Sequence, residues 1–191
     1  MDKKRVKREA LAARRALSAE ERREKSGAIC MHLKRLLSRP EYAGLKTVFS
    51  YRAVWDEADV DAVSAWLAER GIRMCWPVSL EDGVMEAAAP RGADAFQRGA
   101  YGINEPVPER SDIIPPGEVD LIIVPCVAFD RGGNRCGHGA GYYDRYIASC
   151  GPGTPCVLAA FDAQEVPEID TEETDVPIPL IVTESGVREA E

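Results

Sequence analysis

The stretch Asp120-Leu121-Ile122-Ile123-Val124-Pro125 decides the fold. An acidic residue precedes four consecutive aliphatic side chains, and an unbroken apolar run of this kind is typical of a strand that is buried on both faces of a sheet. Such strands belong to parallel sheets, in which crossover segments join one strand to the next. The stretch therefore predicts a central parallel strand in an α/β protein.

Helical and strand patterns alternate on both sides of this strand. Helices are expected over residues 3–16, 18–37, 59–70 and 139–149, and strands over 46–51, 72–76, 84–88, 156–161 and 179–183. Ser18 and Glu21 have the spacing of a capping box at the start of the second helix, and Pro77 is expected to close the strand over 72–76. The Pro- and Gly-rich residues 105–118 are interpreted as a surface loop.

The alternation predicts a single α/β domain over residues 1–191, with a mostly parallel sheet, helices on both faces and a pair of helices at the N-terminus. The chain has 191 residues, of which 45% are hydrophobic, and its net charge is −8. This composition excludes a disordered chain, and the acidity argues against nucleic acid as the main partner.

Neither a membrane span nor an export signal is expected. No apolar run approaches the roughly 20 residues that cross a bilayer, and no apolar stretch follows the basic start. The six cysteines and two histidines form no C-x-x-C pair or zinc-ligand spacing. We expect a cytoplasmic protein with reduced thiols.

Positive charge is concentrated at one end of the chain. Residues 1–25 hold ten basic and five acidic side chains, a net charge of +5, which leaves −13 for the other 166 residues. One interpretation is an anionic partner at this end. The other is a solvated helix face with ordinary ion pairs.

The most informative stretch for chemistry is residues 129–146, FDRGGNRCGHGAGYYDRY. It follows the buried strand and leads into a helix, and ligands of open α/β sheets bind at that end of the strands. Glycine-rich backbone before a helix offers free N–H groups to a phosphate. Arg135 can clamp phosphate oxygens, and the carboxylate of Asp144 can hold Mg²⁺. The spacing matches neither a Walker A loop nor a dinucleotide-binding fingerprint.

Residues 133–146 resemble the G-N-R-x-G-x-G-x-G-Y-Y-D-R-Y signature of the 5-formyltetrahydrofolate cyclo-ligase family. The resemblance covers nearly the whole chain, because five further stretches are similar to family motifs: residues 3–22, 50–57, 101–106, 124–130 and 166–184.

The resemblance implies a cytoplasmic ligase of one-carbon metabolism that binds 5-formyltetrahydrofolate and ATP. Such an enzyme closes 5-formyltetrahydrofolate to 5,10-methenyltetrahydrofolate with ATP and Mg²⁺, and releases ADP and phosphate. The formyl oxygen attacks the γ-phosphate to give a phosphorylated formyl intermediate, and N10 then displaces phosphate from the activated carbon. The protein positions the reactants and stabilises spreading charge. A monomer that binds neither nucleic acid nor membrane is expected.

The same resemblance implies the roles of individual residues. Those matching the ATP site are Lys3, Lys4, Lys7, Arg135, Gly137, His138, Gly139, Ala140, Gly141, Tyr142 and Tyr143. Among them Arg135 and Tyr142 are expected to take part in catalysis. Those matching the folate site are Arg52, Glu57 and Tyr101, and Asp144 matches a metal-binding aspartate.

The chain departs from the family pattern at two places. Lys7 stands where the family usually has Arg, so the charge is kept and the planar guanidinium is lost. Asp175 keeps the first acid of a C-terminal His-Asp-x-x-x-Asp motif, but Pro179 replaces the second, a candidate ligand of Mg²⁺.

These departures leave two other functions open. One is a non-catalytic paralogue that binds folate or nucleotide. The other is a sugar-phosphate isomerase or sensor, because other α/β folds also place glycine loops over phosphates. The Tyr-Tyr-Asp-Arg string and the basic N-terminal helix favour the cyclo-ligase.

Overall fold

A central sheet of eight strands organises the molecule. The computed structural model describes residues 2–80, 84–92, 94–98, 102 and 104–191. The sheet order is β12-β11-β10-β7-β1-β2-β3-β6, and the five strands from β11 to β2 are parallel. The strand bounds are β1 Thr47–Phe49, β2 Arg73–Ser79, β3 Met85–Pro90, β6 Ser111–Ile114, β7 Leu121–Val124, β10 Cys156–Ala159, β11 Leu180–Thr183 and β12 Gly186–Glu189.

Strand β7 confirms the central prediction from the sequence. All four of its residues are buried, and it lies between β1 and β10 with parallel pairing on both sides. Its side chains alternate between two cores: Leu121 and Ile123 belong to one, and Ile122 and Val124 belong to the other. A strand covered on both faces thus accounts for the unbroken aliphatic run.

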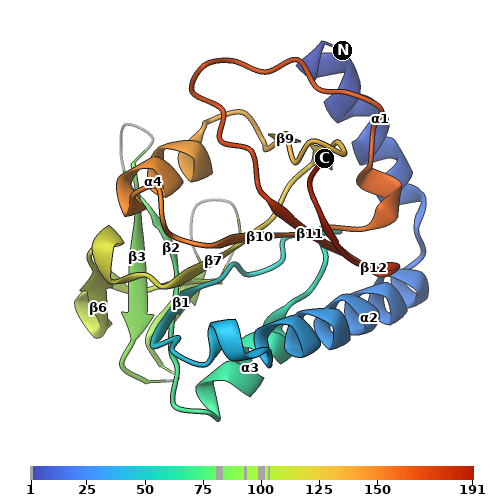
Figure 1. Ribbon diagram of the computed structural model, residues 1–191. Helices are drawn as coiled ribbons and strands as arrows, with labels where there is room; N and C mark the ends of the chain where they lie inside the picture. The colour runs from blue at the N-terminus through green and yellow to red at the C-terminus, as the bar shows by residue number, and fades with distance from the viewer. Residues whose placement is uncertain (1, 81–83, 93, 99–101, 103) are drawn as a thin grey trace.

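Helices cover both faces of the sheet, as expected (Figure 1). Helices α2 (Ala19–Leu37) and α3 (Asp61–Ala68) pack on one face, and α4 (Tyr142–Cys150) packs on the other. The capping box of α2 is present, with Ser18 Oγ accepting from the N–H of Glu21 at 3.1 Å. None of the helices in the described part of the chain has the length and hydrophobicity that crossing a bilayer requires.

The first helix, α1 (Lys3–Ala16), packs away from both sheet faces (Figure 1). Its Val6 and Ala10 belong to a small separate core with Ala128, Cys136, Val166 and Ile169. Two of these residues lie in the hairpin of β8 (Ala128–Phe129) and β9 (Arg135–Cys136), which follows β7. α1 is therefore fixed over the carboxyl end of the central strand.

Two expectations about strands are wrong. Strand β2 continues through Pro77 to Ser79. Its pairing with β1 ends at Cys75, so beyond that residue no β1 carbonyl needs a backbone N–H from β2. Proline, which has no backbone N–H, is therefore tolerated at position 77. Residues 105–118 are not all loop, because β6 pairs with β3 and buries Ser111 and Ile114.

Other elements have no counterpart in the sequence predictions. These are the edge strand β12, the hairpin of β4 (Phe96–Arg98) and β5 (Asn104–Pro106), and the short 3-10 helices η1 (Pro40–Tyr42), η3 (Pro108–Arg110), η4 (Pro116–Glu118) and η5 (Asp162–Gln164).

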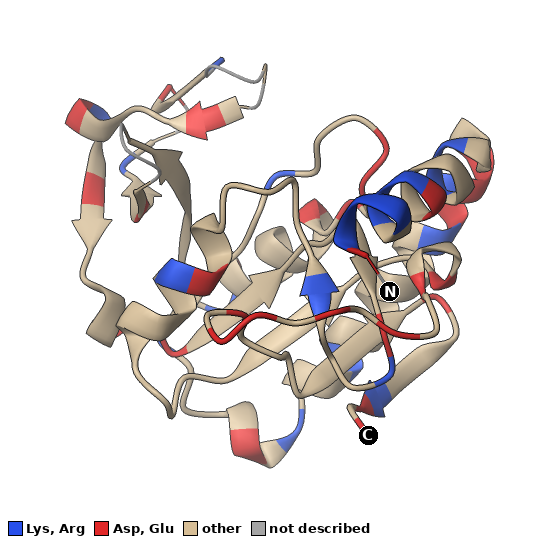
Figure 2. Cartoon of the chain, turned by 90° about the horizontal axis from the view of Figure 1, so that it is seen from above, with Lys and Arg blue, Asp and Glu red and all other residues tan. Residues whose placement is uncertain are grey.

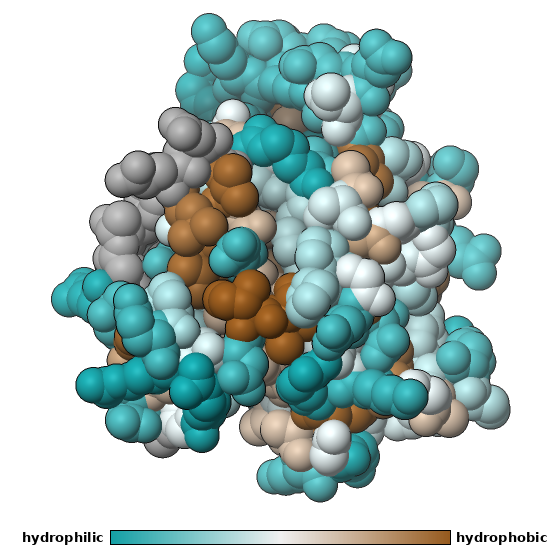
Figure 3. Space-filling model, turned by 90° about the vertical axis from the view of Figure 1, so that its left-hand side faces the viewer, coloured by the Kyte–Doolittle hydropathy of each residue, from teal (hydrophilic) through white to brown (hydrophobic). Residues whose placement is uncertain are grey.

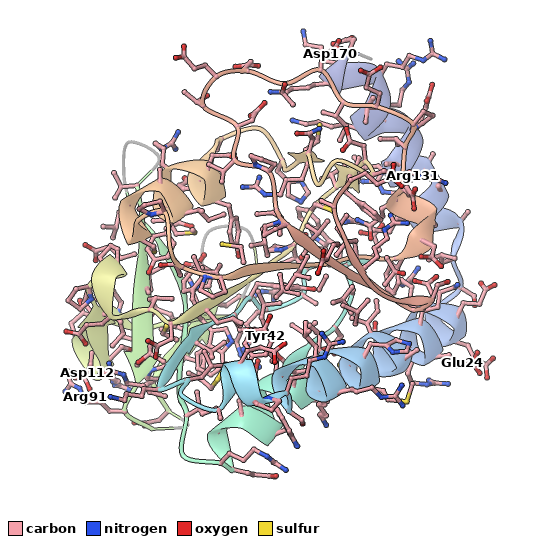
Figure 4. All side chains as sticks on the ribbon, viewed as in Figure 1. Glu24, Tyr42, Arg91, Asp112, Arg131 and Asp170 are labelled. Carbon is pink, nitrogen blue, oxygen red and sulfur yellow. The ribbon has the colours of Figure 1, made fainter. Side chains whose placement is uncertain are left out.

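The side of the molecule that holds α4, β3 and β6 exposes hydrophobic residues, whereas α1 exposes basic ones. A hollowed band of hydrophobic residues crosses this side (Figure 3). On the same side of the molecule Arg91 donates to Asp112 of β6 at 3.0 Å (Figure 4). By contrast, Lys and Arg gather along the first helix (Figure 2). The basic side chains of α1 and this hydrophobic band therefore lie on different parts of the molecule.

Candidate functional site

Two segments that leave adjacent strands meet at the carboxyl end of the sheet. Strands β1 and β7 are parallel neighbours, so the chain after each of them emerges at the same edge. Residues 50–60 follow β1, and the hairpin β8–β9 with the glycine loop 137–141 follows β7. This edge is where ligands bind in open α/β sheets.

The hairpin that carries the glycine loop is held by buried polar contacts. The Asp130 carboxylate accepts from the Asn134 N–H at 3.0 Å, the Asn134 side chain at 3.1 Å and the Ile169 N–H at 3.0 Å. Gly133 has a φ of 75°, and a Cβ there would lie 2.2 Å from the carbonyl oxygen of Ile178. The sequence Gly-Gly-Asn thus allows the C-terminal segment to dock directly on the loop's base.

Arg135 and Asp144, which the sequence assigns to different ligands, bind each other. The Arg135 side chain is 4% exposed and its Nη2 lies 2.9 Å from Asp144 Oδ1. The second guanidinium nitrogen, Nη1, lies 3.4 Å from Asp144 Oδ2, and the Val176 N–H donates to Oδ1 at 3.1 Å. Arg135 Nε is buried and has no hydrogen-bond partner in the described ranges. Asp144 therefore positions Arg135 at the start of α4.

Exposed backbone surrounds the N-terminus of α4. Residues 138–140 are exposed, and Gly139 and Gly141 have φ values of 119° and 66°, which only glycine adopts readily. These conformations explain why the helix begins at Tyr142 and not at 139. The first N–H groups of a helix lack intrahelical acceptors, so this loop can receive an anion.

Two lysines of α1 face the same region. A Cβ built at Gly139 would lie 3.4 Å from Lys7 Nζ, which brings that ammonium onto the glycine loop. Lys3 donates to Glu172 at 2.9 Å and to Asp175 at 2.6 Å. Lys4, also in the first turn of α1, is exposed.

The Lys3–Asp175 pair shifts both of its members toward their charged forms. Burial acts to raise the pKa of Asp175, but hydrogen bonds from Lys3 and from the Glu172 N–H outweigh it and hold that pKa below its usual value. Burial likewise acts to lower the pKa of Lys3, and the two carboxylates raise it overall. The C-terminal segment is thereby tied to the first turn of α1.

Tyr142 and Tyr143 lie half-buried at the beginning of α4. Both pack against the core on this face of the sheet, and the rings of Tyr143 and Phe49 are 6.1 Å apart. Burial raises the pKa of Tyr143 far above its ordinary value, so its hydroxyl stays protonated at neutral pH.

The segment after β1 touches the glycine loop. The Glu57 side chain is 7% exposed, and its Oε1 lies 3.5 Å from His138 Nε2. Its other oxygen accepts from the Val54 N–H at 3.1 Å. The rings of Trp55 and His138 meet edge to face with centroids 5.7 Å apart. The predicted folate and nucleotide residues are therefore in direct contact.

Arg52 belongs to a pocket of about 400 Å³ beside this contact, which Trp55, Asp59, Asp61, Arg98 and Asn104 also line. Its guanidinium donates to Asp61 at 2.7 Å and lies 4.6 Å from the ring centroid of Phe96. Tyr101, the third predicted folate residue, lies outside the described residues.

Arg14 is a buried residue that the sequence interpretation places at the surface. Its side chain is 1% exposed, and it donates to Asp56 at 2.7 Å and to the Cys126 carbonyl at 3.2 Å. It continues the buried stripe of Val6 and Ala10 at a spacing of four residues, and this spacing is the signal that reveals it. Arg14 thus links α1 to Asp56, which precedes Glu57 in the chain.

The described part of the chain holds no ready-made cluster of metal-ligating side chains. Among the described residues no three His, Cys, Asp or Glu side chains are grouped as a metal would require. Asp144 is engaged by Arg135 and Val176 as described above, and the backbone carbonyl of Pro179 accepts from the Ala190 N–H at 2.8 Å.

Comparison with known proteins decides the family. The model of the 5-formyltetrahydrofolate cyclo-ligase family matches residues 1–184. The chain belongs to the 5-formyltetrahydrofolate cyclo-ligase family. This membership confirms the resemblance and the expected enzyme class, a ligase.

Relatives and solved structures agree with this assignment. The chain is 31% identical to the 5-formyltetrahydrofolate cyclo-ligase of Escherichia coli K12 over 92% of its own length and 97% of the relative's. It is similar to the 5,10-methenyltetrahydrofolate synthetase of Aquifex aeolicus, with a TM-score of 0.82, 30% identity and coverage of 99% and 93%. The synthetase from Mycoplasma pneumoniae has the same fold, with a TM-score of 0.80, 24% identity and coverage of 96% and 99%.

Proposed function

We propose that this chain catalyses the ATP- and Mg²⁺-dependent cyclisation of 5-formyltetrahydrofolate to 5,10-methenyltetrahydrofolate, with release of ADP and phosphate. The observation that carries the proposal is the contact of Trp55 and Glu57 with His138. Phosphoryl transfer from ATP to the formyl oxygen requires the two substrates to lie side by side. A folate segment that touches a phosphate loop meets this requirement.

The nucleotide phosphates are proposed to bind between α1 and the N-terminus of α4. The ammonium of Lys7 would lie 3.4 Å from a Cβ built at Gly139, beside the loop 137–141, and the helix N-terminus favours negative charge there. Arg135 reinforces the positive potential from below, and Tyr142 and Tyr143 form the adjoining wall. Lys3 contributes by leaving the carboxylates of Glu172 and Asp175 and binding phosphate instead. Lys4 contributes a positive charge nearby.

Folate is proposed to occupy the pocket of Arg52, with its pterin edge toward Glu57. A buried carboxylate accepts hydrogen bonds from the N–H groups of that edge. The formyl oxygen then attacks the γ-phosphorus, the bond from that phosphorus to the β-phosphate oxygen breaks, and ADP leaves, while Lys7 and the loop amides stabilise the charge on the equatorial oxygens. N10 next attacks the activated formyl carbon and loses its proton to water or to the departing phosphate. The carbon–oxygen bond to phosphate then breaks, and the methenyl bridge remains.

Mg²⁺ dependence rests on the family resemblance and not on a ligand set in this chain. Both oxygens of Asp144 are engaged by hydrogen-bond donors, and Pro179 offers no side-chain ligand. These residues do not fit a direct protein-bound ion. We propose that Mg²⁺ arrives with the phosphates of ATP and that Asp144 acts by orienting Arg135. The cytoplasmic location and the monomeric state stay predictions.

The test is to mix the protein with MgATP and 5-formyltetrahydrofolate and to follow the absorbance of the methenyl product. We expect product with the wild type and a KM for ATP raised at least about tenfold in Lys7→Ala, because one charge-assisted contact to phosphate is lost. The exposed neighbour Arg8 gives the matched control, Arg8→Ala, with kinetics near those of the wild type.

Two outcomes contradict the proposal in different ways. Folate that binds without forming product indicates the non-catalytic paralogue. A protein that does not bind folate rejects both folate functions.

A further inference from the structure

Trp55 combines two unfavourable features in one residue. At 73% exposure it is the most exposed of the large hydrophobic side chains in the described part of the chain. It is also the only non-glycine residue there with a positive φ, 52°. A bulky side chain in the left-handed region is a genuine outlier, and such strain concentrates at ligand clamps and active sites.

The strained turn is fixed by the residues on both sides of Trp55. The Glu57 N–H donates to the Val54 carbonyl at 3.0 Å, and Glu57 in turn accepts from the Val54 N–H at 3.1 Å. The intervening Asp56 is bound by the buried Arg14 at 2.7 Å. The turn is thus held firmly while the indole that it presents is left in water.

The indole lies at the boundary of the two substrate regions. It lines the pocket that contains Arg52, and its ring meets that of His138 in the glycine loop edge to face. A ligand that extends from the pocket toward His138 therefore lies beside the indole. At the observed exposure most of the indole surface is available to such a ligand.

We propose that Trp55 binds the flat ring system of the folate substrate and holds it against the glycine loop. This inference rests on the proposed function, since it names the substrate of the same site. A planar conjugated ring matches an exposed indole in shape, and aromatic pairs of this kind are favourable beyond the area that they bury. The role assigned to Trp55 is binding and orientation, with no part in bond making.

The test compares three substitutions at this position. We expect the KM for 5-formyltetrahydrofolate to rise about tenfold in Trp55→Ala and about twofold in Trp55→Phe, which keeps a ring. The KM for ATP should change less than twofold in both. Trp55→Gly should lose as much folate affinity as Trp55→Ala and yet melt at or above the wild-type temperature, because glycine relieves the positive φ.

Tryptophan fluorescence provides a readout that does not depend on turnover. Titration with 5-formyltetrahydrofolate without ATP should quench the wild-type emission. Most of this quenching should be lost in Trp55→Phe, and the remainder comes from Trp76, whose ring centroid lies 5.1 Å from the Arg52 guanidinium. Trp66 of α3 is the matched control, because it stacks with Arg70 on another part of the molecule, 4.0 Å from ring centroid to guanidinium. In Trp66→Phe the quenching should persist.

The outcomes separate this inference from the proposed function. Quenching and tight folate binding without product uphold the role of Trp55 and reject the reaction. Normal turnover with an unchanged KM for folate in Trp55→Ala overturns the role of Trp55 and leaves the reaction standing. A KM that rises for ATP alone assigns the indole to the nucleobase and also overturns the inference.

Discussion

Replacing Arg14 by methionine tests the buried connection between α1 and the site. The side chain is 1% exposed and donates to Asp56 at 2.7 Å and to the Cys126 carbonyl at 3.2 Å. Its removal leaves the Asp56 carboxylate, which is 11% exposed, without its nearest cation. Removing one partner of a buried pair destabilises a protein by about 3–5 kcal/mol. We expect a loss near about 3 kcal/mol, because Arg15 lies 3.8 Å from the other oxygen of Asp56 and offsets part of the charge.

Urea unfolding followed by circular dichroism measures this loss. Arg15→Ala is the control, since this neighbour is 70% exposed and pairs with the same carboxylate, and an exposed pair contributes about 0–1 kcal/mol. The double variant Arg14→Met with Asp56→Leu should recover at least about 1.5 kcal/mol, because no buried charge is then left unpaired. A loss below about 1 kcal/mol for Arg14→Met, or a double variant as unstable as the two single ones combined, would refute this reasoning.

Three further predictions concern the loop and the ion pairs around it. Gly133→Ala should lower the unfolding free energy by more than about 2 kcal/mol, because the residue has a positive φ and the new Cβ would lie 2.2 Å from a backbone carbonyl oxygen. Thermal melting measures this loss. The control Gly153→Ala should melt near the wild-type temperature, because nothing lies within 4 Å of a Cβ built there. Lys3→Met should destabilise by about 1 kcal/mol between roughly pH 5 and pH 10. The difference from wild type should vanish as the pH falls through the lowered pKa of Asp175 or rises through the raised pKa of Lys3, and a pH-independent difference in urea unfolding would contradict the pairing. Asp144→Asn should lower kcat without changing the Mg²⁺ concentration needed for half-maximal rate, whereas a large rise in that concentration would make this residue a metal ligand.

The elements that could be predicted are those whose cause lies within a few residues. Four aliphatic side chains in a row allow few structures other than a strand buried on both faces, and β7 is that strand. Ser18 and Glu21 satisfy each other's backbone N–H, so their spacing alone marks the start of α2. Pro77 misled because its effect depends on whether a neighbouring strand needs its N–H, which only the sheet order decides.

The site shows the same division between local and distant causes. The glycine loop and its position after a buried strand were readable from the sequence. The spacing of Arg14 after Val6 and Ala10 indicates its burial, but the sequence does not reveal its partner Asp56, which is 42 residues away. Likewise the motif gives Asp144 as an acid near phosphates, and only the fold shows that it is bound to Arg135. The role of a charged residue depends on its neighbours in space, whereas the sequence shows only its neighbours along the chain.

The docking of α1 has a consequence for how the molecule is made. The helix ends at Ala16, but its small core includes Val166 and Ile169, and Lys3 binds Asp175. At a synthesis rate of about 5–20 residues per second, these contacts become available only on the order of ten to thirty seconds after the helix leaves the ribosome. The nascent chain can therefore pair β1, β2 and β7 before it can close the corner that we propose binds ATP, and that corner forms only after residue 175 has been synthesised.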